Sequence, residues 1–158
     1  MAITPNTAFT QGQQFSANQA NRFPRGIMAG QTLQTTFTTS ATHTTYQDSG
    51  ATVTITEQIG RIYRVVMMAP VYPSGGLQAM KFRFVRGSTA INDFLIPSAA
   101  LDAANGYPAH LTFVYTSASS GSQTWKVQVC AVTANTAVSI FGDATFQRQF
   151  WIEDIGES

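Results

Sequence analysis

The sequence predicts an all-β protein, folded as a sandwich or a barrel, from its composition and its spacing of apolar segments. Only 11% of the 158 residues are charged, against about 25% in a typical soluble domain. Aromatic residues are plentiful, with eleven Phe, five Tyr and two Trp, and threonine is frequent. Strands favour this composition. Short apolar segments recur at roughly ten-residue spacing between Gly- and Ser-rich turns, which favours a sandwich or barrel over alternating strands and helices.

About eight or nine strands are expected, and no segment has a helical pattern of useful length. Two segments show the signal best. In residues 51–56, Ala51, Val53 and Ile55 alternate with threonines, which predicts a half-buried strand. Residues 61–69 (RIYRVVMMA) are apolar on both faces, which predicts a central strand. The full set of expected strands is residues 33–39, 51–56, 61–69, 77–86, 90–96, 110–116, 123–132, 137–141 and 146–156.

The strand expected over residues 146–156 (FQRQFWIEDIG) has two different faces, because successive side chains point to opposite sides of a strand. One face carries Phe146, Arg148, Phe150 and Ile152. The other face carries Trp151 among polar residues. We therefore expect a central strand that closes a sheet, with Trp151 either covering a local edge or meeting another subunit.

Residues 1–29 are expected to form an extended N-terminal arm, followed by one β-sandwich domain over residues 30–158. The first 21 residues contain no charge, and their apolar side chains are too few for a core. Such a segment is either a disordered tail or an arm held by neighbouring molecules. We expect an anchoring arm whose contacts come from Ile3, Phe9, Phe15, Phe23 and Arg25.

No set of residues predicts catalysis, so we expect a protein that is not an enzyme and needs no metal or cofactor. His43 and His110 lie far apart, without a carboxylate or cysteine at ligand spacing. Cys130 lies in an alternating strand, which favours a packed thiol over a nucleophile. Glu153 and Asp154 are adjacent, so in a strand they point in opposite directions and make a poor acid–base pair.

The net charge of +1 gives no reason to expect nucleic acid or an acidic membrane as a partner. No apolar run approaches the roughly 18 residues that span a bilayer, and no signal peptide is expected. Lys81, Arg83 and Arg86 form the one basic cluster. This cluster is either a solvated strand face or a group that pairs with acids of a neighbouring subunit.

Several short motifs, taken in order, resemble a group of small bacteriophage virion surface proteins. The strongest is the final FWIEDIG, which resembles the apolar, Glu-Asp, Ile-Gly ending of that group. The other motifs are a Phe and Gly-Gln pair in the arm, an Ala/Asn turn, a Pro-Arg-Gly and three strand segments. In this chain the motifs fall at residues 9–13, 16–21, 23–26, 38–42, 60–65, 121–128 and 150–156.

The resemblance implies a jelly-roll-like antiparallel sandwich, assembled as a homotrimer on the virion surface and made in the cytoplasm of the host bacterium. Such proteins are head decoration (cement) proteins or minor tail components. We expect a decoration protein whose arm binds the major capsid protein, and subunits that meet through Tyr63, Phe150 and Trp151. The alternative is a tail or tail-fibre component that binds a receptor or carbohydrate through Tyr46, Tyr72, Tyr107 and Trp151.

Overall fold

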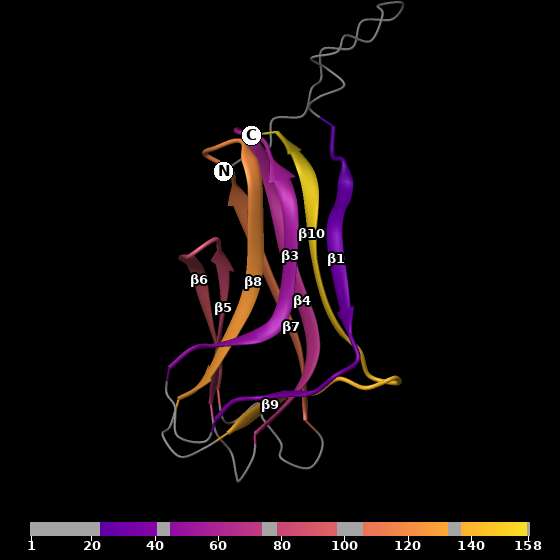
Figure 1. Ribbon diagram of the computed structural model, residues 1–158, viewed down its shortest axis with the longest axis vertical. Helices are drawn as coiled ribbons and strands as arrows, with labels where there is room; N and C mark the ends of the chain where they lie inside the picture. The colour runs from indigo at the N-terminus through magenta and orange to yellow at the C-terminus, as the bar shows by residue number, and fades with distance from the viewer. Residues whose placement is uncertain (1–22, 41–44, 74–78, 98–105, 133–136, 158) are drawn as a thin grey trace, which may run out of the picture.

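The computed structural model describes residues 23–40, 45–73, 79–97, 106–132 and 137–157, and the predicted all-β sandwich is confirmed. Ten strands form two antiparallel sheets that pack face to face (Figure 1). None of these residues lies in a helix. The strands are β1 (Gly26–Leu33), β2 (Phe37–Thr38), β3 (Gln47–Glu57), β4 (Arg61–Pro73), β5 (Met80–Arg86), β6 (Thr89–Ile96), β7 (Tyr107–Thr116), β8 (Gly121–Ala131), β9 (Val138–Ile140) and β10 (Arg148–Glu157).

The strand order is that of a jelly roll. One sheet, here called the β4 sheet, runs β1-β10-β4 and continues with β7 on the other side of β4, while short β9 and β2 extend one end. The second, here called the β8 sheet, runs β3-β8-β5-β6. The long strands therefore pair in nested fashion, β1 with β10, β3 with β8, β4 with β7 and β5 with β6. This nesting is a long hairpin wrapped over two sheets, as in jelly rolls.

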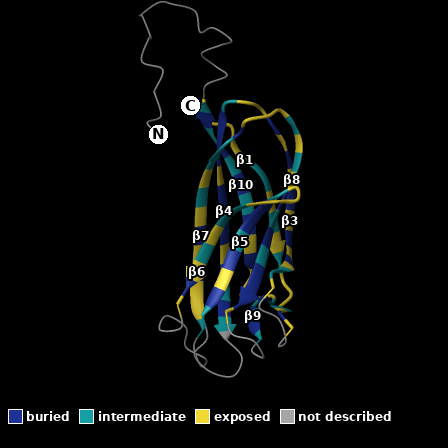
Figure 2. Cartoon of the chain, turned by 90° about the vertical axis from the view of Figure 1, so that its left-hand side faces the viewer, coloured by how far each residue is buried: buried dark blue, intermediate teal, exposed yellow. Residues whose placement is uncertain are grey.

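Apolar and polar residues alternate along the strands, and this alternation sets which side faces the other sheet (Figure 2). In β3 the predicted pattern is confirmed, because Ala51, Val53 and Ile55 are buried and the threonines between them are exposed. In β8 the predicted inward row is fully buried. That row is Trp125, Val127, Val129 and Ala131.

Large side chains from both sheets meet in the core. Phe84 of β5 stacks on Phe150 of β10, with ring centroids 6.1 Å apart. Tyr115 of β7 meets Trp125 of β8 edge to face at 5.3 Å. Each pair joins one sheet to the other, so the aromatic contacts hold the two layers in register.

The prediction that residues 61–69 form a central strand is confirmed. β4 pairs with β10 on one edge and with β7 on the other. Tyr63, Val65 and Met67 face the core and are at most 1% exposed. Val66 faces the outer side, yet it too is only 3% exposed. Burial on both faces explains the apolar run as far as Met67, while Met68 lies on the outer face and is 42% exposed.

The last strand is central, between β1 and β4, but it begins at Arg148 rather than at residue 146. Asp143 accepts hydrogen bonds from the backbone amides of Thr145 and Phe146 at 2.7 and 2.6 Å, which forms a turn. Phe146 is therefore 57% exposed instead of lying on the core face. Arg148 does lie on that face, where it donates to the carbonyl oxygen of Ser49 at 2.9 Å.

The first strand lies earlier than the sequence pattern predicts. Instead of one strand over residues 33–39, the chain forms β1 over Gly26–Leu33 and the two-residue β2. β1 (GIMAGQTL) alternates poorly, and it forms because it pairs with β10 along its length, with one irregularity between Ile27 and Ala29. Residues 26–29 of the expected arm thus belong to the sandwich, and residues 1–22 of that arm lie outside the described residues.

Replacing Phe150 by alanine is expected to destabilise the protein by about 3–5 kcal/mol, because it removes a buried ring and leaves a cavity between the sheets. Urea unfolding followed by circular dichroism measures this change. The matched control is Gln149→Ala, which alters the exposed neighbour and should change the free energy of unfolding by less than about 0.5 kcal/mol. Equal effects of the two variants would contradict the core position of Phe150.

Candidate functional site: the arm junction and the outer face of the β4 sheet

The residues expected to contact partners lie in three different settings. Ile3, Phe9 and Phe15 fall outside the described residues. Phe23 and Arg25 lie just before β1 and are exposed, Phe23 to 46%. The expected subunit-interface residues do not share one surface. Tyr63 and Phe150 face the core, and Trp151 faces the outer side of the β4 sheet.

Tyr63 and Phe150 are core residues, so they cannot supply an aromatic surface for another subunit. They are 0% and 1% exposed, and both point toward the β8 sheet. The Tyr63 hydroxyl also accepts a hydrogen bond from the Gln58 amide at 2.9 Å. Burial raises the pKa of Tyr63. Trp151 follows Phe150 in the strand and therefore points to the opposite, outer side, where it is half-buried.

A buried ion pair fixes the point at which the arm meets the sandwich. Arg61, at the start of β4, donates from Nε to Asp154 Oδ2 at 2.7 Å, and its Nη2 contacts Oδ1. Both side chains are at most 1% exposed. The same Arg61 Nη2 donates to the carbonyl oxygen of Phe23 at 2.7 Å. The amide of Arg25 donates to the Asp154 carbonyl oxygen at 3.2 Å.

This arrangement makes Asp154 the centre of the junction. Its carboxylate pairs with Arg61, lies 4.0 Å from Arg25 Nε and accepts the Gly156 amide at 3.0 Å. If the two side chains separated, each would leave a buried charge without compensation. The pair therefore keeps the start of β4 and the end of β10 in one relative position. The Glu-Asp of the FWIEDIG motif therefore divides its roles, since Asp154 faces inward and Glu153 outward.

On the outer face of the β4 sheet, Trp151 belongs to a fixed array with Glu153 and Arg64. The indole Nε1 donates to Glu153 Oε1 at 2.8 Å, and Arg64 Nε donates to Glu153 Oε2 at 2.8 Å. Hydrogen bonds from Trp151 and then from Arg64 lower the pKa of the Glu153 carboxyl. The array presents an aromatic ring and an internally neutralised pair of charges.

Apolar side chains from the three neighbouring long strands, β1, β4 and β7, lie around this array. Ile27, Met68 and Val114 are 68%, 42% and 52% exposed. Val66 lies opposite Trp151 between β4 and β10. One open hollow, of about 320 Å³, lies beside Trp151 and Ile27. A second, of about 260 Å³, lies farther along the sheet beside Met68, Pro108 and His110.

The outer face of the β8 sheet is different in character. Strands β3 and β8 present hydroxyl groups there, and Thr54 and Thr124 share a hydrogen bond of 2.8 Å. Several of its charges are bound within the chain. Lys126 pairs with Asp48 at 2.9 Å, which helps to lower the pKa of that carboxyl, and Arg83 donates to Gln128 at 2.6 Å. The two faces of the sandwich are therefore chemically distinct.

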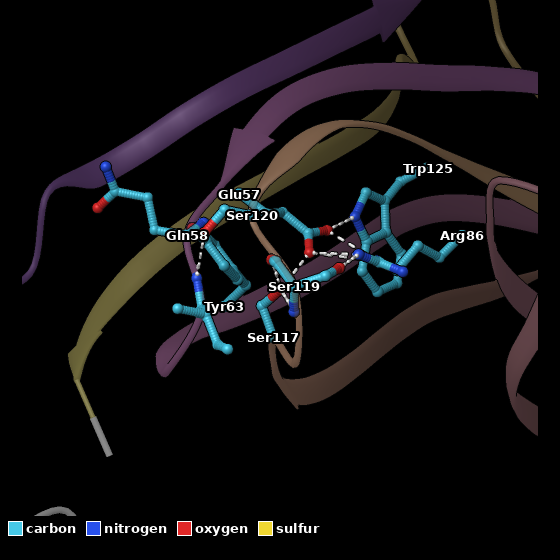
Figure 3. A network of polar contacts seen from close by, with 9 residues as sticks. Glu57, Gln58, Tyr63, Arg86, Ser117, Ser119, Ser120 and Trp125 are labelled. Atoms are coloured by element: carbon cyan, nitrogen blue, oxygen red, sulfur yellow. Dashed lines mark hydrogen bonds and ion pairs between the residues drawn. The ribbon is translucent and has the colours of Figure 1, made fainter.

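The proposed basic cluster is divided, because Arg86 points inward to a buried carboxylate that the sequence analysis overlooked (Figure 3). Glu57 is 0% exposed and pairs with Arg86 Nη2 at 3.0 Å. It also accepts from Trp125 Nε1 at 2.7 Å and from Ser117 Oγ at 2.6 Å. The hydrogen bonds that Arg86 donates to the Glu57 carboxylate raise the pKa of Arg86. Strict alternation in TVTITE was the available signal, since it places Glu57 on the core face.

The residues considered for catalysis do not converge in the described part of the chain. His43 lies outside the described residues, while His110 is exposed and meets Thr112 Oγ1 at 3.3 Å. Cys130 is buried, and burial raises the pKa of its thiol. No group of three His, Cys, Asp or Glu side chains within the described ranges is placed to hold a metal ion. Those ranges also contain no helix of the length and hydrophobicity needed to cross a bilayer.

The aromatic residues expected to stack on sugars are dispersed. Tyr46 lies under the guanidinium of Arg83, 4.0 Å from its ring centre, and burial raises its pKa to about 12. Tyr72 packs edge to face on Phe141. Tyr107 begins β7 at 36% exposure, and Trp151 lies on the outer face of the β4 sheet. They do not form one stacking surface.

Comparison with known proteins adds little to this description. No protein-family model and no curated protein sequence matches the chain. Among solved structures, the chain is similar to the insecticidal delta-endotoxin Cry8Ea1 from Bacillus thuringiensis, with 14% identity and a TM-score of 0.37. The match covers 82% of this chain and 20% of the toxin, so this chain spans a fifth of the toxin's length.

Asp154→Asn is expected to lower the free energy of unfolding by about 3–5 kcal/mol, because it leaves the buried Arg61 charge without compensation. Urea unfolding provides the measurement. The control is Glu157→Gln, since Glu157 lies 3.9 Å from the same Arg61 but is 38% exposed. An exposed pair contributes at most about 1 kcal/mol. A loss as small for Asp154→Asn as for the control would contradict the junction described above.

The Cys130 thiol is expected to resist modification in the folded protein, because it is 2% exposed and its raised pKa keeps it protonated near neutral pH. Reaction with a disulfide reagent at pH 7 should be slow in buffer. In denaturant it should reach one thiol per chain, since the chain has a single cysteine. Rapid reaction of the native protein would show that the site is accessible.

Proposed function

We propose that this protein is a non-enzymatic structural protein of a bacteriophage particle, a decoration protein that its N-terminal arm anchors to the major capsid protein. The observation that carries the proposal is the arm junction. Arg61 and Asp154 form a buried pair, and this pair holds the backbone of Phe23 and Arg25 against the sandwich. The charge-free first 21 residues, with few apolar side chains, thus precede a point of the chain that is held against the sandwich.

The chemistry of the arm fits an anchor better than a catalytic or nucleic-acid-binding element. Uncharged, amide-rich residues form backbone and side-chain hydrogen bonds along another protein, and Ile3, Phe9 and Phe15 supply separate apolar contacts. Jelly rolls occur in viral capsid and lectin domains, among others, and the fold agrees with the proposal.

Replacing the arm's apolar residues is expected to weaken capsid binding. The variant Ile3→Ser, Phe9→Ser, Phe15→Ser removes the proposed contacts and keeps the sandwich. If several arms of one assembly bind together, the apparent affinity should fall by roughly 10²- to 10⁴-fold, because linked weak sites are lost together. Co-sedimentation with empty capsids of the phage that encodes this sequence measures the affinity and the saturating ratio.

The matched control is Thr4→Ser, Thr7→Ser, Thr10→Ser, which changes the same arm without altering its apolar contacts. This control should bind like the unmodified protein, with saturation at a fixed number of copies per capsid. Equal binding by both variants would overturn the anchoring role of the arm. Binding to purified tails but not to capsids would make the protein a tail component, and binding to neither would overturn the virion role.

A further inference from the structure

We infer that the outer face of the β4 sheet, centred on Trp151, is a contact surface for a second copy of this chain. This inference goes beyond the anchoring role, and it holds whether or not the arm binds a capsid. It also corrects the sequence-based expectation, because it retains Trp151 and replaces Tyr63 and Phe150, which are buried.

The first argument is the contrast between the two sandwich faces. On the β4 sheet, Ile27, Met68 and Val114 are exposed on three strands, around the half-buried Trp151 on the fourth. On the β8 sheet, Leu95 is the one large apolar side chain that is mainly exposed within a described strand. Single exposed apolar residues are ordinary, but a group across a whole sheet marks an interaction surface.

The second argument is charge. The array places one acid and one base near the centre of the face, and Arg64 and Glu153 already neutralise each other. A strongly charged partner would gain little there. Protein interfaces are enriched in Trp and Met and depleted of charge at their centre. The chain itself has a net charge of +1 and only 11% charged residues, so its own surface matches this face.

The third argument is shape. The same face carries projecting side chains and hollows, with Ile27 beside the hollow of about 320 Å³ and Met68 beside that of about 260 Å³. A second copy supplies both the projections and the hollows, as contacts between identical subunits require. The hydrogen bond from Trp151 to Glu153 keeps the ring in one position, which lowers the entropy lost when the surfaces meet.

The test is the mass of the full-length protein in solution, measured by sedimentation velocity. The unmodified chain is expected to sediment as an assembly of several 17.1 kDa copies. Met68→Glu and Val114→Glu should each shift it to the monomer, because each would bury a new charge at the contact. Val114 is 52% exposed, so glutamate there lies in solvent in the monomer and the fold is retained.

The matched control is Leu95→Glu, the same change at a 59% exposed position on the opposite sheet, which should leave the mass unchanged. Acrylamide quenching gives a second readout. Trp125 is 0% exposed, so increased quenching in the monomeric variants should come from Trp151. Circular dichroism confirms that each variant is folded.

Three outcomes would overturn the inference. The unmodified chain could sediment as a monomer, or the assembly could persist in both Met68→Glu and Val114→Glu. In the third, Leu95→Glu would disrupt the assembly as strongly as the two variants of the β4 sheet. None of these measurements uses a capsid, so they fail or succeed independently of the proposed virion role.

Discussion

The structure depends on the aromatic contact between its two sheets. Phe84 and Phe150 stack across the interior, and Tyr115 meets Trp125 nearby, so each sheet supplies one ring to each pair. Each sheet buries one apolar face, and aliphatic side chains such as Val65, Met67 and Val127 fill the core around these rings. The depth of this core also explains the Glu57 carboxylate, which lies where the Trp125 indole needs an acceptor.

Two buried ion pairs close the same end of the sandwich. The amide of Ser117, whose hydroxyl bonds Glu57, donates to the carbonyl oxygen of Arg61, so the Glu57–Arg86 and Arg61–Asp154 pairs are connected through the backbone. Buried pairs are expensive in desolvation and add little net stability, but they fix geometry because neither partner can be left alone. Here the fixed geometry is the start of β4 and the exit of the N-terminal arm.

The arm junction and the outer face of the β4 sheet divide the proposed interactions between two parts of the molecule. β10 links them, because Asp154 faces inward to Arg61 while Trp151 and Glu153 face outward. One short motif therefore holds the backbone of Phe23 and Arg25 and also supplies Trp151 to the proposed contact between copies. The β8 sheet, with its hydroxyl-rich and internally paired surface, is left to face solvent or a different partner.

The sequence by itself determined the β class, the central place of β4 and β10, and the inward rows of β3 and β8, because alternation with a period of two is a local property of the chain. Tertiary structure decided the rest. Pairing with β10 decided where β1 lies, although the alternation of apolar and polar residues in β1 is weak. Alternation could assign Tyr63 to one face of β4 and Phe150 to one face of β10. Only the packing of the sheets showed that both of these faces are turned toward the core. It likewise showed that Trp151 lies outside, since local pattern does not reveal which side of a sheet another sheet will cover.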